Sequence, residues 1–159
     1  DVLISVGSKH ISFEVGTTVV VSRRLEGDFL NYGKAIPESF RSAVTVDRNE
    51  FMRAVDRVSL IIDEKTKNPV RLTFGDGTID FMCVTPIGKA EDVCTCGGVC
   101  ENIEIGFNDR YLMDAVKAAP TDKLVISLNT GSSPCTITPA EGEKNFVYMI
   151  LPVRLRAGE

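Results

Sequence analysis

The sequence has 159 residues, of which 43% are hydrophobic and 25% are charged, and its formal net charge at pH 7 is −4. These proportions are typical of a folded chain and exclude an intrinsically disordered one. No run approaches the ~20 apolar residues that a membrane-spanning helix needs, so we expect no membrane partner. The acidic balance argues against a surface that is basic all over, although one face can still carry a basic patch.

The chain opens on DVLISVG, without Met or a basic and apolar leader, so we expect it to begin inside a longer protein. Without a secretory signal, its five cysteines favour a reduced, cytoplasmic setting. Cys94, Cys96 and Cys100 cluster around two glycines. Their spacing is not the paired pattern of zinc sites and the only histidine is distant in sequence, so we expect no metal and no other cofactor. The simpler interpretation is small residues on a strand and its turn.

The first part of the chain predicts three short strands separated by turn signals. They are LISV, HISFEV and TTVVVSRRL, all within residues 2–25. A polar connector that contains Gly and Pro follows over residues 25–39.

Two later segments predict amphipathic helices. Residues 45–62 carry apolar side chains at helical spacing after an N-cap at Asp47, and residues 105–119 repeat the pattern after an N-cap at Asn108. FMRAV in the first segment matches LMDAV in the second. The chain therefore contains an internal repeat of about 60 residues.

A meander of strands follows each predicted helix. VRLTF and TIDFMCVTP follow the first, while LVISL, PCTITP and NFVYMILPVRL follow the second. The two helix-plus-meander repeats predict an α+β domain over residues 41–159. Residues 1–40 are interpreted as an incomplete domain, the meander of a partial third repeat, whose open strand edges we expect to pair with something else.

Three phrases carry a resemblance to a known family: LEGDFLNY from residue 25, IGFN followed by YL from residue 105, and MILPVRL from residue 149. Together they resemble the bacterial sliding clamp, the β subunit of DNA polymerase III. The resemblance covers the whole chain, from the second half of the clamp's middle domain through its third domain. It implies the α+β DNA-clamp fold, also called the processivity fold.

The resemblance also implies a function. The full-length protein would be a head-to-tail homodimer ring that encircles duplex DNA without sequence specificity and acts as a processivity factor in DNA replication. The DNA polymerase III alpha subunit, the clamp loader and other proteins with a clamp-binding motif would dock by short peptides in a hydrophobic groove. Such a protein is not an enzyme and has no catalytic residue. Without the first domain of another subunit, we expect this chain not to build that ring.

The groove pattern of the family maps onto apolar residues with a few polar ones at the margin. These are Leu30, Asn31, Tyr32, Ala35, Asn108, Tyr111, Pro134, Met149, Leu151, Pro152, Val153 and Arg154. Pro is common in the family where this chain has Leu30, so that corner of the groove is expected to differ. The alternative is that residues 149–153 form a core strand, with about half of their side chains buried.

Basic residues on the helices and in the loop after the first are expected to hold DNA phosphates loosely. These are Arg48, Arg53, Arg57, Lys65, Lys67, Arg110 and Lys117. The alternative is an ordinary solvated helix face, since acidic residues share both helices. The resemblance places the subunit interface at Leu60, Ile61, Val93 and Cys94.

Two functions of other classes stay open from the residues alone. The cysteine cluster could belong to an enzyme that uses a thiol or a metal, but no activating base lies near it in the sequence. The second is a structural interaction module that does not contact DNA.

Overall fold

The computed structural model describes residues 1–63, 68–142 and 146–155. The chain forms two compact units, Asp1–Gly33 and Lys34–Glu159. Within the described ranges, no helix is both long and apolar enough to cross a bilayer.

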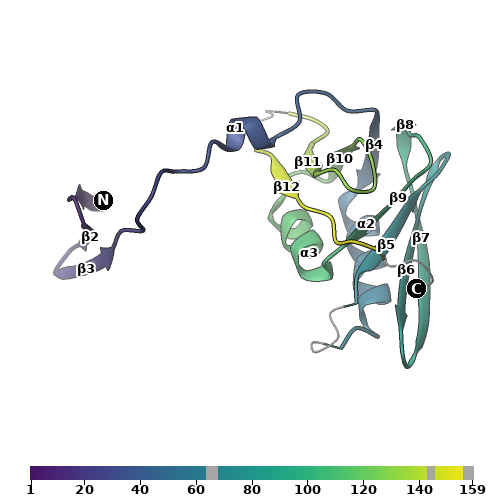
Figure 1. The fold of residues 1–159 in the computed structure, drawn as a ribbon, viewed down its shortest axis with the longest axis horizontal. Coiled ribbons are helices and arrows are strands. Elements are labelled where there is room, and N and C mark those ends of the chain that lie inside the picture. Colours follow the sequence, from purple (N-terminus) through teal and green to yellow (C-terminus); the bar gives the residue numbers. More distant parts are fainter. Residues whose placement is uncertain (64–67, 143–145, 156–159) are drawn as a thin grey trace. The chain divides into compact units, whose positions relative to one another are not determined.

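The first unit is a single antiparallel sheet of three strands, β1 (Leu3–Val6), β2 (His10–Val15) and β3 (Thr18–Arg23) (Figure 1). Gly16, with a φ of 58°, supplies the left-handed residue in the tight turn between β2 and β3. Most apolar side chains of β1 and β3 are exposed, because no second layer within residues 1–33 covers them. The sheet is therefore held mainly by backbone pairing.

A single helical turn, α1 (Tyr32–Ala35), interrupts the connector that we predicted as irregular. Four residues are too few to show helical periodicity in a sequence, so this element could not be recognised there.

The second unit combines two antiparallel sheets with two helices. The five-stranded sheet has the order β12-β11-β10-β4-β8, with bounds Tyr148–Ile150, Cys135–Pro139, Lys123–Leu128, Ser42–Asp47 and Gly97–Val99. The four-stranded sheet has the order β7-β6-β5-β9, with bounds Gly88–Thr95, Thr78–Thr85, Val70–Phe74 and Ile103–Phe107. The predicted α+β class is thus confirmed.

The two predicted helices are present as α2 (Arg48–Ser59) and α3 (Asp109–Ala118), and they pack against each other. Their N-caps are the predicted ones. The carboxylate of Asp47 accepts the N–H of Glu50 at 2.9 Å, and the amide oxygen of Asn108 accepts the N–H of Tyr111 at 3.3 Å. Each cap satisfies a backbone donor that has no partner within the helix.

The predicted helices nevertheless began too early, because a strand precedes each cap. β4 ends at Asp47 and alternates buried and exposed side chains, with Val44 and Val46 in the core. β9 likewise precedes Asn108. β-branched residues two apart fit a half-buried strand better than a helix.

The leading strands are exchanged between the repeats. β4, which precedes α2, pairs with β10 of the second repeat, from Lys123↔Asp47 to Leu128↔Ser42. β9, which precedes α3, pairs with β5 of the first repeat, from Val70↔Phe107 to Phe74↔Ile103. Each sheet therefore contains strands from both repeats, and one continuous core fills the space between sheets and helices. The rings of Phe51 of α2 and Phe81 of β6 pack edge to face in this core, with their centroids 5.1 Å apart.

The sequence predicted one long strand at the C-terminal end, but the structure has only a short one there. Pairing in β12 stops at Ile150, and Pro152 has no N–H to continue a ladder. The chain then runs past α3, and the N–H of Val153 donates to the carbonyl of Gly106 on β9 at 2.8 Å (Figure 1). The segment thus joins the five-stranded sheet to the four-stranded one.

Glycine at position 106 makes this junction possible. A Cβ there would lie 2.6 Å from Cδ2 of Leu155 and 2.9 Å from the carbonyl oxygen of Val153. Both distances are shorter than side chains tolerate, so the terminal segment would have to shift.

We predict that Gly106→Ala lowers the free energy of unfolding by about 1–3 kcal/mol, the usual cost of overpacking. Urea denaturation measures it. Gly97→Ala is the matched control, because a Cβ at Gly97 meets nothing within 4 Å, and it should change stability by no more than about 0.5 kcal/mol. Equal stabilities for the two variants would contradict the close approach.

Candidate functional site

A groove of about 650 Å³ lies between α3 and the C-terminal segment. Its lining residues come from one side of α3 and from β12 with the residues after it. They are Asn108, Tyr111, Asp114, Ala115, Ala118, Tyr148, Met149, Ile150, Leu151 and Val153. All of them belong to the second unit.

The shape of the groove follows from the helix. Ala115 and Ala118 lie about one and two turns beyond Tyr111, and their small side chains leave space that larger ones would fill. The side chains of Tyr111 and Leu151 are about two-thirds exposed. A concave, mainly apolar surface with exposed aromatic and aliphatic side chains suits a hydrophobic anchor of a partner.

Five of the predicted groove residues line this groove: Asn108, Tyr111, Met149, Leu151 and Val153. Of these, Asn108 also caps α3. The other predicted members are not among the lining residues. Pro134, Ala35, Pro152 and Arg154 lie elsewhere in the second unit, while Leu30, Asn31 and Tyr32 belong to the first unit.

The prediction missed Asp114, Ala115, Ala118, Tyr148 and Ile150. A signal for the helical ones was present in the sequence. Asp114 and Ala118 are three and seven residues after Tyr111 and therefore share its side of the helix. Asp114 brings the only charge among the lining residues.

The basic residues predicted to face DNA differ in their surroundings. Arg53 and Lys117 are exposed on α2 and α3, and so is Arg110. Arg48 is half-buried, where its guanidinium donates to the carbonyl of Ala119 at 3.4 Å and lies 3.6 Å from a carboxylate oxygen of Asp122. Arg48 therefore ties the start of α2 to the end of α3 and offers little open charge.

Lys65 and Lys67 lie outside the described residues. That they face DNA stays a prediction.

Arg57 forms an ion pair with Asp92 of β7. The Arg57 guanidinium holds the pKa of Asp92 below its ordinary value. A lowered carboxyl pKa gives stability that is present above the pKa of the unfolded state and is lost as the pH falls through the folded value. The pair is therefore intact at neutral pH, and part of the Arg57 charge is neutralised.

The residues predicted to form the subunit interface differ in their exposure to solvent. Leu60 is 79% exposed at the end of α2 and Val93 is 51% exposed on β7, while Ile61 is half-buried. Among the strands that the structure describes, β7 lies at a sheet edge and pairs with β6 alone. Alternation along β7 turns the side chain of Cys94 into the core, where it is 1% exposed, so Cys94 can offer only its backbone to a partner.

The cysteine cluster has the surroundings of structural thiols. Burial raises the pKa of Cys94 to about 12, and burial also raises the pKa values of Cys96 and Cys100. A thiol with a raised pKa contains little of the thiolate that acts as nucleophile or metal ligand. No group of three or more His, Cys, Asp or Glu side chains in the described part of the chain is arranged to hold a metal.

We predict that buried Cys83, Cys94 and Cys135 do not react with an aromatic disulfide reagent at pH 8 while the protein is folded. Burial raises all three pKa values, that of Cys135 also to about 12, and closes access. Half-buried Cys96 and Cys100 should react slowly, and all five thiols should react in urea. Fast reaction of Cys94 in the folded protein would favour the thiol enzyme.

The chain is similar to known proteins over nearly its whole length. The family described as DNA polymerase III beta subunit, C-terminal domain, matches residues 33–154. The beta sliding clamp of Staphylococcus aureus is 30% identical over 97% of this chain and 41% of its own length, and that of Synechocystis is 33% identical over 97% and 40%.

Two solved structures agree with these relatives. A sliding clamp from Bartonella birtlesii bound to griselimycin superposes with a TM-score of 0.87 at 32% identity, over 97% of this chain and 41% of that one. The DNA polymerase III subunit beta of Pseudomonas aeruginosa gives a TM-score of 0.86 at 26% identity, over 97% and 42%. The chain thus spans about two fifths of the length of the relatives it matches.

Proposed function

The chain belongs to the DNA polymerase III beta subunit family and contains its C-terminal domain, and on this premise we propose that it is part of a cytoplasmic sliding clamp that tethers the replicative polymerase to duplex DNA. The observation that carries the proposal is the groove between α3 and the terminal segment. It is a site for binding and not for chemistry. The chain acts as a non-catalytic accessory subunit.

The groove takes short peptides from the DNA polymerase III alpha subunit, the clamp loader and other partners. Its apolar lining accepts a pair of hydrophobic anchors, and exposed Tyr111 and Leu151 lose water-accessible surface when an anchor enters. The carboxylate of Asp114 favours a basic or neutral residue beside the anchors over an acidic one. That a related clamp binds griselimycin supports the view that this family takes up ligands.

The exposed cations of α2 and α3 face the DNA backbone. Arg53 and Lys117 are both exposed, and the helices that carry them pack against each other, which supports a shared basic surface. Contacts to phosphates alone carry no sequence information, and a few of them hold a duplex loosely enough for sliding. In the whole protein, two subunits close head to tail, with Leu60, Ile61, Val93 and the free edge of β7 at the interface.

We predict that Leu151→Ala weakens binding of a peptide with a Leu-Phe pair by roughly 1 kcal/mol or more, because the truncated side chain no longer contacts the anchor. Ile87→Ala is the matched control: Ile87 is also exposed but lies outside the groove. Calorimetric titration measures the affinities, and circular dichroism checks the fold. If both folded variants bound like the unaltered protein, Leu151 would not be part of the peptide site.

We predict weak, sequence-independent binding of duplex DNA that Arg53→Gln weakens further. Removing one phosphate contact should reduce the slope of log K against log salt by about 1. Lys89→Gln is the control, because it removes the same charge from the edge strand β7, where Lys89 pairs with Glu91. Fluorescence anisotropy at several salt concentrations measures both variants.

Tight binding at physiological salt, or preference for one sequence, would contradict sliding. An equal effect of the two substitutions would mean that only net charge matters and that the helix face is not the contact.

A further inference from the structure

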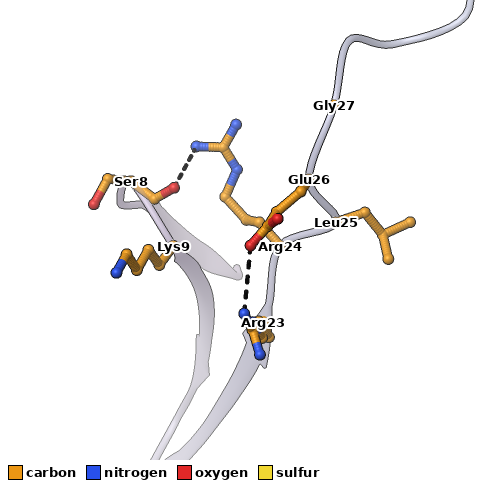
Figure 2. A pocket seen from close by; sticks show the side chains of 7 residues that line it. All are labelled: Ser8, Lys9, Arg23, Arg24, Leu25, Glu26 and Gly27. Carbon is orange, nitrogen blue, oxygen red and sulfur yellow. Dashed lines mark hydrogen bonds and ion pairs between the residues drawn. The ribbon is translucent and has the colours of Figure 1, made fainter.

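A second pocket, of about 230 Å³, is lined only by residues of the first unit, none of which lines the groove (Figure 2). It forms where the turn between β1 and β2 faces the chain that leaves β3. Two backbone hydrogen bonds fix this end of the sheet: the N–H of Gly7 donates to the carbonyl of His10 at 2.8 Å, and the N–H of Arg24 donates to that of Lys9 at 2.9 Å. The pocket is lined by Ser8, Lys9, Arg23, Arg24, Leu25, Glu26 and Gly27.

Positive charge is concentrated at this pocket. Residues 1–33 contain three Lys or Arg side chains, and all three line it, although the same residues contain four acidic side chains. Only one of the four, Glu26, is among the lining residues. The cations are therefore gathered at one place in a unit that carries no positive excess.

Arg24 is held in place without being neutralised. Its Nη1 donates to the carbonyl of Gly7 at 2.8 Å and to that of Ser8 at 3.4 Å, and Figure 2 shows it reaching back over the turn. Within the described residues Arg24 pairs with no carboxylate. A guanidinium has five N–H donors in a rigid fork, so the remaining ones can bind an oxyanion, and a fixed side chain loses less entropy when it does.

Arg23 is held by a partner that can be exchanged. Its Nη2 lies 3.4 Å from Oε1 of Glu26, and the two side chains are 77% and 91% exposed. An exposed ion pair of this kind contributes little stability. A phosphate group, which accepts charge-assisted bonds from arginine in a fork-like geometry, can displace the carboxylate.

We propose that this pocket binds a phosphate group of a nucleic-acid strand, with Arg24 as the fixed donor and Arg23 as the donor released from Glu26. Lys9 adds charge without a required geometry. The proposal rests on the proposed function only in its choice of nucleic acid as the source of the phosphate. It adds a contact from the first unit to those of the helices.

The test titrates the full chain with a fluorescent single-stranded oligothymidylate, followed by anisotropy, and with inorganic phosphate, followed by amide chemical shifts. Arg24→Gln should lower the oligothymidylate affinity about tenfold, as expected for a lost charge-assisted hydrogen bond. Glu26→Gln should raise it severalfold, because the competing carboxylate is gone. A gain of affinity cannot come from loss of the fold. Lys89→Gln, in the second unit, should leave the affinity nearly unchanged.

Phosphate should shift the amides of residues 7–9 and 23–27. Unchanged oligothymidylate affinity in both Arg24→Gln and Glu26→Gln would overturn the proposal. So would inorganic phosphate shifting these amides while the oligothymidylate does not, since the source would then be a free anion. Binding of the Leu-Phe peptide is measured on the same samples. Peptide binding tests the groove of the second unit, and oligothymidylate binding tests the pocket of the first unit. Failure of one proposal can therefore be told apart from failure of the other.

Discussion

The exchange of leading strands between the two repeats is the constraint on which the rest of the second unit depends. β4 completes the sheet of the repeat that follows it, and β9 completes the sheet of the repeat that precedes it. Neither repeat can close its sheet alone, so the two fold as one core with α2 and α3 in contact. Backbone hydrogen bonds between segments some 80 residues apart, such as Ser42 and Leu128, thereby fix where both helices lie.

The groove between α3 and the terminal segment results from that arrangement. α3 follows β9 directly, so the strand that belongs to the first sheet also sets the position of one groove wall. The other wall is the terminal segment, which leaves the five-stranded sheet at Ile150 and returns to β9 at Val153. On α2 the contacts of Arg48 and Arg57 serve to hold the helix to its neighbours, which leaves Arg53 as the more open of its cations.

Much of this was predictable from sequence, and the failures have physical reasons. The caps Asp47 and Asn108, the helices after them and strands such as β5 were correct because capping and periodicity are local signals. β8 and the break at Pro152 were missed, since Gly97–Val99 has no alternating pattern and is a strand only because β4 lies beside it. Half of the groove lining was found through family resemblance. Asp114 and Ala118 could have been predicted from their helical spacing to Tyr111, which places them on the same side of α3.

The hydrogen bond from Val153 to Gly106 has a consequence for how ligand binding and folding are linked. β12 pairs with β11, β11 pairs with β10, and β10 pairs with β4, which is the first strand of this unit in the sequence. One wall of the groove forms only when all of these strands are paired. Any partly unfolded form that has lost one of these pairings therefore lacks the groove. A ligand that binds only the complete groove stabilises the folded domain by RT ln(1 + [L]/Kd). Occupancy by a partner would then lower the population of every open form that breaks this succession, including forms that open far from the residues that touch the partner.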